Sequence, residues 1–212
     1  MSPVPSPAAG PRRDDLLDAA IWAFARKGFR RASVSDIVAR AQVARGTFYL
    51  YFDSKEDVFL AIVDEFHDRV RRMLEEPEAP IPLADHHGRA LLQRTLRRWL
   101  ELFARHRDAA HVILREATSI DPKFEARVRR LRELGVNYFA TRFERLQARG
   151  LVNPAVSPDL VAHLQMGMVD EAVNEFILPA PRVDIDALAG QIASFEWDGL
   201  RPDRSGPAPS RL

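Results

Sequence analysis

The chain has 212 residues, of which 46% are hydrophobic and 29% charged, enough to bury the core of one or two globular domains. It contains no cysteine, which excludes disulfides, thiolate catalysis and cysteine zinc sites. The formal net charge is only +1, but residues 1–55 carry +4 and residues 56–212 carry −3, so the basic end favours an anionic partner such as nucleic acid.

The N-terminal residues are expected to form an arm followed by a helix. Residues 1–12 contain four prolines and little to bury, which predicts a disordered arm. A helix is expected over residues 14–27, because apolar residues recur there on one face, and Gly28 suits its C-terminal cap. The apolar residues of this helix are interpreted as core.

Residues 33–55 have the pattern of two short helices joined by a tight turn. The first begins with a capping box, in which the Ser33 hydroxyl and the Asp36 carboxylate satisfy free backbone N–H groups. The side chains expected to be buried after the turn are Val43, Phe48 and Phe52. Those expected to face outward are small, basic or aromatic: Arg45, Gly46, Thr47 and Tyr49.

The outward residues of the second short helix suit a DNA groove. Gly46 lets backbone approach a phosphate, Thr47 can contact a thymine methyl or a phosphate, and Arg45 can neutralise the DNA backbone or read guanine. A second capping box at residues 54–57 begins the next helix, where the helix N-terminus and Lys55 are expected to hold a phosphate. The expected DNA contacts are Ser33, Arg45, Gly46, Thr47, Tyr49 and Lys55. Such residues also occur as plain solvated surface, but two capping boxes in register with an aromatic cluster favour DNA binding.

Residues 16–66 resemble the N-terminal domain of the TetR family of transcriptional regulators. The resemblance is carried, in this spacing, by Ala19-Ala20, Phe24, Gly28-Phe29, Ile37, Val43, Gly46-Thr47-Phe48-Tyr49, Tyr51-Phe52 and Lys55. Two positions depart from the family pattern. Gln42 stands where the family usually has glycine, and must adopt a conformation that glycine reaches more easily. Ala44 stands where the family often has serine, so a helix cap of about 1 kcal/mol is missing.

The remaining sequence predicts an all-α protein with about nine helices. A helix-turn-helix domain at residues 13–57 is followed by a connector helix at 58–76, and prolines within residues 77–82 mark a boundary. A second domain is expected at residues 83–200, with helices near 83–106, 108–119, 121–149, 157–178 and 184–197, and a disordered tail at residues 201–212. The resemblance implies the same layout: a three-helix helix-turn-helix domain, then a helical domain for ligand binding and dimerisation.

The resemblance also implies a homodimer, because TetR-like proteins pair through the last two long helices of each subunit. Apolar stripes are available on both helices: Val161, Leu164, Met168, Ala172 and Phe176 on one, and Ile185, Leu188, Ile192 and Phe195 on the other. Gly167 is compatible with close helix approach. A two-fold dimer places its recognition helices ~34 Å apart, or a multiple of that, which predicts a pseudo-palindromic operator. Such stripes also occur as intramolecular core.

The second domain resembles the family's variable effector-binding part. Aromatic and polar residues at helical spacing are expected to line a small-molecule pocket: Trp99, Phe103, His111, Arg115, Tyr138, Arg142, Gln165 and Asn174. An inward Arg115 or Arg142 would indicate an anionic or carboxylated ligand. Aromatic residues at this spacing are also the normal content of a core, so both interpretations stay open.

The leading hypothesis is a homodimeric repressor that a small-molecule effector releases from its operator, through a coupling free energy of about 1–3 kcal/mol. A ligand-independent regulator or an activator on the same scaffold stays open. An enzyme is disfavoured, because the chain has no Gly-rich phosphate loop and no signature Ser–His–acid spacing. A helical DNA coat would bind without sequence preference.

No cofactor, metal or membrane partner is expected. The adjacent His86 and His87 point in different directions on a helix and have no ligand at metal-binding spacing. The longest apolar run, residues 19–25, is too short to span a bilayer. The first residues lack the apolar core of a secretion signal, so a cytoplasmic location is expected.

Overall fold

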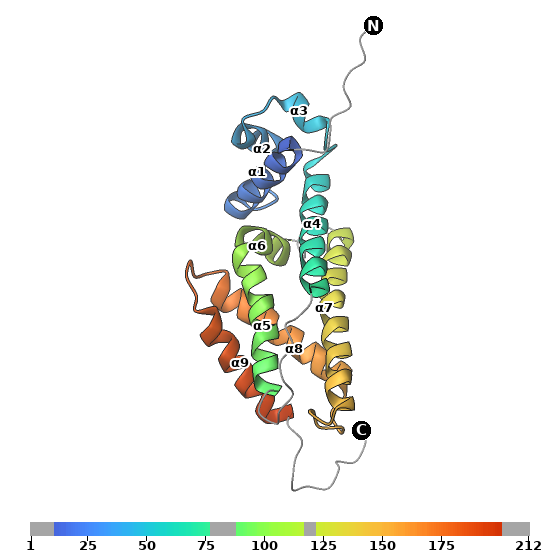
Figure 1. The fold of residues 1–212 in the computed structure, drawn as a ribbon. Coiled ribbons are helices and arrows are strands. Elements are labelled where there is room, and N and C mark those ends of the chain that lie inside the picture. The colour runs from blue at the N-terminus through green and yellow to red at the C-terminus, as the bar shows by residue number, and fades with distance from the viewer. Residues whose placement is uncertain (1–10, 77–87, 117–121, 201–212) are drawn as a thin grey trace. The chain divides into compact units, whose positions relative to one another are not determined.

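The computed structural model describes residues 11–76, 88–116 and 122–200, and every regular element in these ranges is helical (Figure 1). The elements are α1 (Pro11–Lys27), α2 (Val34–Ala41), α3 (Arg45–Tyr49), α4 (Lys55–Glu75), α5 (Gly88–Arg105), α6 (Arg107–Glu116), α7 (Pro122–Ala148), α8 (Pro158–Ala172), the π-helical turn η2 (Val173–Ile177) and α9 (Ile185–Leu200). The predicted fold class is therefore confirmed.

Several predicted boundaries shift. The first helix begins at Pro11, inside the expected arm, because proline is well tolerated in the first turn of a helix. The helix expected over residues 157–178 ends at Ala172 and is followed by η2. The rest of the arm, the proline boundary, His86-His87, Asp121 and the tail lie outside the described residues.

The chain divides into two compact units, and the division differs from the one expected. The first unit comprises residues up to 69 together with residues 108–129; the second comprises residues 70–107 and 130 onward. Most of α6 and the start of α7 therefore pack with the N-terminal helices, although the sequence analysis assigned them to the second domain. The physical reason is their apolar side chains, which complete the core of the first unit.

Four phenylalanines show how the first unit is held together. Phe24 of α1 and Phe59 of α4 are fully buried, and Phe29, just after α1, lies between them at ring-centroid distances of 5.2 and 5.4 Å. Phe124, near the start of α7, is also fully buried, 4.9 Å from Phe59 and 6.0 Å from Phe29. Offset and edge-to-face rings at these distances stabilise a core beyond their buried area.

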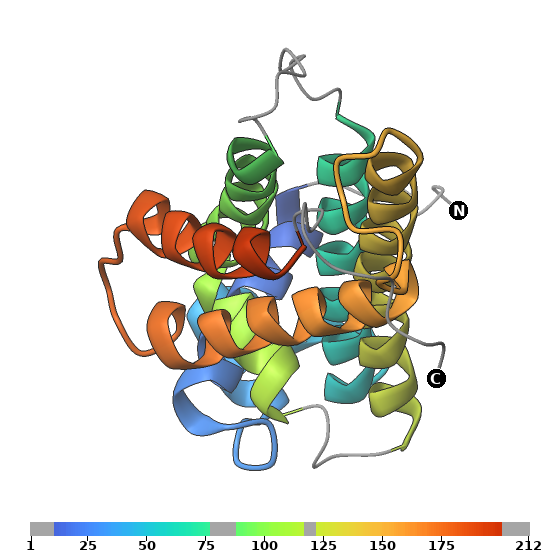
Figure 2. The ribbon, with the colours of Figure 1, turned by 90° about the horizontal axis from the view of Figure 1, so that it is seen from below.

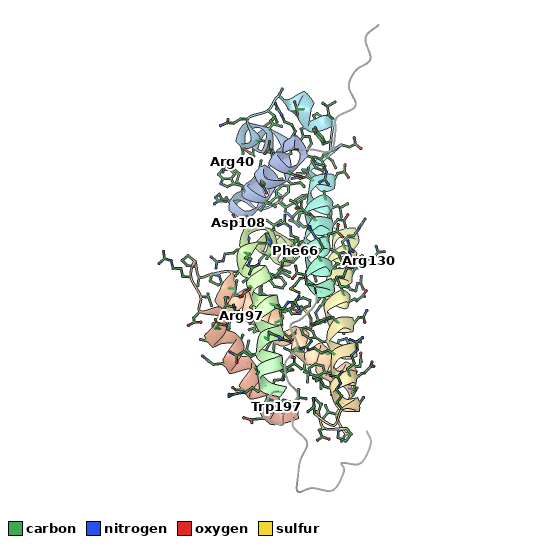
Figure 3. All side chains as sticks on the ribbon, viewed as in Figure 1. Arg40, Phe66, Arg97, Asp108, Arg130 and Trp197 are labelled. Carbon is green, nitrogen blue, oxygen red and sulfur yellow. The ribbon has the colours of Figure 1, made fainter. Side chains whose placement is uncertain are left out.

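The second unit contains α5, α8, η2, α9 and most of α7 (Figures 1 and 2). Two glycines allow its helices to approach closely. A Cβ on Gly88 would clash with the Trp197 ring, so the first residue of α5 must be small where the end of α9 crosses it (Figure 3). A Cβ on Gly135 of α7 would lie 2.7 Å from the Met166 sulfur and 2.9 Å from the Trp99 ring.

Candidate nucleic-acid interface

The start of α2 is fixed by the predicted capping box. The Asp36 N–H donates to the Ser33 hydroxyl at 3.2 Å, and the Ser33 N–H donates to the Asp36 carboxylate at 3.0 Å. The Lys27 ammonium lies 2.6 Å from the same carboxylate. These hydrogen bonds, that of Lys27 first, lower the pKa of Asp36 to about 2, so the carboxylate is ionised at neutral pH.

The turn between α2 and α3 has the conformation expected for Gln42. Its backbone is left-handed, with φ 56° and ψ 41°, a region that glycine adopts more easily. The Gln42 N–H donates to the Ala39 carbonyl at 3.3 Å and the Val43 N–H donates to the Val38 carbonyl at 3.1 Å. Both bonds close the last turn of α2, so the chain leaves it in a defined direction for α3.

The recognition helix α3 has one buried side and one exposed side. Phe48 is fully buried and Phe52 nearly so, with ring centroids 5.8 Å apart. On the exposed side the Arg45 guanidinium donates to the Tyr49 hydroxyl at 3.4 Å and lies 5.9 Å from its ring centroid. A Cβ on Gly46 would meet nothing within 4 Å. Ala44 provides no side-chain cap, as expected.

The outward prediction for α3 agrees with this geometry, with two adjustments. Thr47 is half-buried, and so is Val43, which was expected inside. Tyr49 is 47% exposed and Leu50, which the sequence analysis did not select, is 65% exposed. Arg45, Gly46, Thr47 and Tyr49 thus lie on one short helix whose opposite side is packed into the core by Phe48 and Phe52.

Lys55 lies differently from what was expected. Its ammonium donates to the carbonyls of Phe29, Arg30 and Ala32 at 2.8, 3.3 and 3.1 Å and lies 4.5 Å from the Phe29 ring centroid. The three donors of the ammonium are thus directed at the loop between α1 and α2, which argues against the expected phosphate contact. The Ser54 hydroxyl accepts from the Asp57 N–H at 3.2 Å, so the cap predicted at the start of α4 is present.

Three arginines near these helices were missed by the sequence analysis. Arg26 of α1 and Arg40 of α2 each lie 5.0 Å from the Trp22 ring centroid, and Arg13 lies 5.6 Å from that of Phe52. Arg26 also pairs with Asp108 of α6 at 3.5 Å. The Trp22–Arg26 spacing of i, i+4 was readable from the sequence, whereas the Arg40 contact depends on tertiary packing.

The residues expected to line an effector pocket do not form one set. His111 and Arg115 belong to α6 in the first unit, and Arg115 is exposed, so it does not point inward as considered. Trp99 and Phe103 are 2% and 3% exposed and pack as core. Tyr138 and Arg142 remain together on α7, where the Arg142 guanidinium donates to the Tyr138 hydroxyl at 3.4 Å.

The other two expected pocket residues, Gln165 and Asn174, have partners on α8 and α9. The Asn174 amide donates to the Asp170 carbonyl at 3.0 Å. Gln165 is 1% exposed, and its amide donates to the Glu196 carboxyl on α9. Burial raises the pKa of Glu196 to about 8, opposed by the Gln165 hydrogen bond. Sequence reasoning missed Glu196, although it shares an apolar face of α9 with Ala189 and Ala193.

A surface groove of about 590 Å³ runs between α5 and α9. None of the expected effector residues lines it; the lining residues are Arg89, Gln93, Asp186, Ala187, Gly190, Gln191 and Ser194. In the part of the chain that the structure describes, no three side chains of His, Asp or Glu converge as metal ligands. Within the same ranges, no helix combines the length and apolar content needed to cross a membrane.

The capped α2, the left-handed turn and the anchored α3 define a helix-turn-helix protein, the class that presents its second helix to DNA. Comparison with known proteins identifies the family. Residues 16–62 match the model of bacterial regulatory proteins, tetR family. The chain is 28% identical over 192 residues to the uncharacterised HTH-type transcriptional regulator YdgC of Bacillus subtilis (strain 168), covering 90% of this chain and 93% of that protein.

Two solved structures share the fold over most of the chain. One is the transcriptional regulator FadR from Bacillus subtilis in complex with stearoyl-CoA, with a TM-score of 0.72 and 21% identity, covering 88% of this chain and 98% of that one. The other is AibR in complex with isovaleryl coenzyme A and operator DNA, with a TM-score of 0.67 and 20% identity, covering 87% and 97%. The N-terminal helix-turn-helix of this chain therefore belongs to the tetR family of bacterial regulatory proteins, and over most of its length the chain is similar to transcriptional regulators.

Proposed function

We propose that this TetR-family regulator is a homodimeric repressor that binds a pseudo-palindromic operator through α3 and leaves it when a small-molecule effector binds. The observation that carries the proposal is that α3 has one buried side and one exposed side. Phe48 fixes its buried side, while Arg45, Gly46 and Tyr49 are exposed together on the other. A groove-reading helix requires this combination, because base edges are reached only by side chains held on a rigid support.

A homodimer is supported by exposed apolar side chains on the last helices. The side chains in question are Leu160 and Leu164 of α8, Phe176 of η2 and Phe195 of α9, each more than half exposed. A Cβ on Gly167 would meet nothing within 4 Å, so the backbone of α8 is open there and a second helix can approach it closely. Val161 and Ala172 of the predicted stripe are instead buried within the chain. Burying the exposed set on a second copy removes apolar area from water.

The effector class that we propose is a coenzyme A thioester. Two structures with this fold were solved with stearoyl-CoA and isovaleryl coenzyme A, respectively. Arg142 and Tyr138 form a cationic and hydroxyl-bearing pair on α7 that suits an anionic or carbonyl group. Repression rather than activation is the simplest form of the proposal, because bound protein blocks access to the DNA; a ligand-independent regulator or an activator would share the same α3 contacts.

Selection of binding sites from a random duplex library tests the DNA-binding part. Wild-type protein is expected to recover a pseudo-palindrome, and Tyr49→Ala is expected to bind it at least about tenfold more weakly, because a base or phosphate contact is lost. Circular dichroism and sedimentation of the variant should match the wild type, since Tyr49 is exposed. Equal recovery by both proteins, or weak salt-sensitive binding without a motif, would contradict the proposal and favour a DNA coat.

Titration of the operator complex with acyl-CoA thioesters of different chain length tests the effector part. One or more of them should dissociate the complex, whereas free coenzyme A should act weakly because it lacks the acyl group. The same incubations analysed for thioester hydrolysis address the enzyme alternative. Turnover of the thioester would favour an enzyme, and unchanged operator affinity with every thioester would reject this effector class.

A further inference from the structure

Six large apolar side chains of the described residues are exposed, and they fall in two places. Four are the α8, η2 and α9 side chains proposed above for dimerisation. The other two, Tyr49 and Leu50, are adjacent at the end of α3. Single apolar residues scattered over a surface are ordinary. Two neighbours confined to the helix proposed for a DNA groove indicate instead an apolar contact with the DNA.

The geometry of α3 places Leu50 beside an open notch. Leu50 lies four residues after Gly46, so the two share one side of the helix. A Cβ on Gly46 would meet nothing within 4 Å, which leaves free space there. The Leu50 backbone is still helical, with φ −75° and ψ −20°, and its N–H donates to the Thr47 carbonyl at 3.3 Å. A helical side chain inclines toward the helix N-terminus, so Leu50 leans toward the side of Gly46, and because no Leu50 atom lies within 4 Å of a Cβ on Gly46, there is room for a methyl group between them.

We propose that Leu50 and the notch at Gly46 receive the 5-methyl group of one thymine in each operator half-site, which makes Leu50 a specificity-determining residue. The thymine methyl is the apolar group on the base edges of the major groove. It suits Leu50, whose side chain can neither donate nor accept a hydrogen bond, and Gly46, which has no side chain. The Arg45–Tyr49 pair on the adjoining side of α3 remains available for polar contacts. The inference rests on the proposed DNA binding through α3.

The test uses the operator recovered by selection, with each thymine replaced in turn by uracil, which removes only the methyl group. At one position in each half-site, uracil should weaken wild-type binding about fourfold, the equivalent of exposing one methyl-sized group. Leu50→Ala should bind the thymine operator about fourfold more weakly and should no longer distinguish thymine from uracil at that position. Leu50→Met, which keeps an apolar chain, should retain the distinction.

A rescue and a matched variant separate Leu50 from its neighbours. If cytosine is placed at the sensitive position, 5-methylcytosine should restore about fourfold in affinity for the wild type but nothing for Leu50→Ala, because only the methyl has been returned. Thr47→Ser tests the competing assignment, because it removes the methyl group of the half-buried residue that the sequence analysis also placed near a thymine, and it should leave the thymine–uracil distinction intact. Circular dichroism should show the same helical content for every variant, since Leu50 is exposed.

Two failures are distinguishable. A recovered pseudo-palindrome with no position at which Leu50→Ala abolishes the thymine–uracil distinction would overturn the role of Leu50 and leave the proposed function standing. If Thr47→Ser lost the thymine–uracil distinction and Leu50→Ala kept it, the role of Leu50 would also be overturned while the proposed function stood. Recovery of no motif by the wild-type protein would reject the DNA-binding proposal itself, and this inference with it.

Discussion

The Lys55 ammonium fastens the loop between α1 and α2 to the start of α4. It donates to the backbone carbonyls of residues 29, 30 and 32, and it lies against the Phe29 ring. The loop leads directly into Ser33, the cap of α2. Because hydrogen bonds from a charged donor are stronger than those between neutral groups, this single cation helps to set the position from which α2 and α3 continue.

Lys55→Met removes the three donors and keeps most of the unbranched side chain. The free energy of unfolding should fall by about 1–3 kcal/mol, measured by urea denaturation, because the loop carbonyls lose hydrogen bonds to a charged donor. The salt dependence of operator binding by the folded variant should be unchanged. The opposite pattern, wild-type stability with a salt slope lower by about one, would show that the ammonium contacts a phosphate after all.

Glu196 makes the stability of the protein depend on pH in the neutral range. Burial raises the pKa of its carboxyl from 4.5 to about 8 in the folded chain. The folded state therefore holds the proton more tightly than the unfolded state. The contribution to stability is complete below the unfolded pKa of 4.5 and is lost as pH rises through about 8.

Glu196→Gln keeps the shape and cannot ionise, so the decline in stability between about pH 5 and 8 should become flatter. Urea unfolding of both proteins across this range measures the difference. Asp36 does not interfere, because the hydrogen bonds from Lys27 and Ser33 hold its pKa at about 2. Its contribution is present above its ordinary pKa of 3.8 and is lost only as pH falls toward 2. Parallel pH profiles for the two proteins would contradict the assignment to Glu196.

At the scale of elements, the core of the first unit joins α1, α4 and α7 through Phe24, Phe29, Phe59 and Phe124. Phe124→Ala should lower the free energy of unfolding by about 3–5 kcal/mol, because it leaves a cavity beside the Phe29 and Phe59 rings. Phe124→Leu, which fills more of the space, should cost less. Chemical denaturation followed by circular dichroism measures both. A cost near zero for Phe124→Ala would show that the start of α7 does not pack against these helices.

Local signals in the sequence predict the helix-turn-helix well. The Ser33–Asp36 capping box, the left-handed Gln42 and the uncapped Ala44 all agree with the structure. Each of these features depends on backbone groups within four residues along the chain, so the sequence alone determines them. The buried side of α3 follows for the same reason, since Phe48 and Phe52 share one helix face.

Features that depend on distant partners could not be predicted in this way. The carbonyls that bind Lys55 lie 23 to 26 residues earlier in the chain. His111 and Arg115 belong to α6, which packs with the first unit, whereas Trp99, Tyr138 and Arg142 belong to the second, and helical spacing alone does not predict this division. The buried Glu196 has its partner Gln165 on another helix. Helical spacing gives the face on which a residue lies but not the element that covers it.

At the scale of the whole molecule, two helices belong to both units. Residues 55–69 of α4 and 122–129 of α7 lie in the first unit, and the remainder of each helix lies in the second (Figure 1). Tyr138 and Arg142, in the proposed effector region, are therefore on the same uninterrupted helix as Phe124. The chain of α7 thus runs from the residues proposed for the effector into the aromatic core of the first unit.

The exposed apolar side chains of α8 and α9 determine how two such chains are expected to assemble. In a two-fold dimer each residue of the interface occurs twice, so Leu164→Glu introduces two like charges into an apolar contact. Self-association should weaken about 100-fold or more, measured by sedimentation, because like charges brought together away from water repel strongly. Thr141→Glu adds the same charge at an exposed position of α7 and should leave the dimer intact.

With the dimer disrupted, Leu164→Glu should retain the helical content of the wild type. It should bind the full operator no better than a single half-site, because two recognition helices are no longer linked. A Leu164→Glu protein that remains dimeric and binds the operator normally would exclude this face of α8 from the interface.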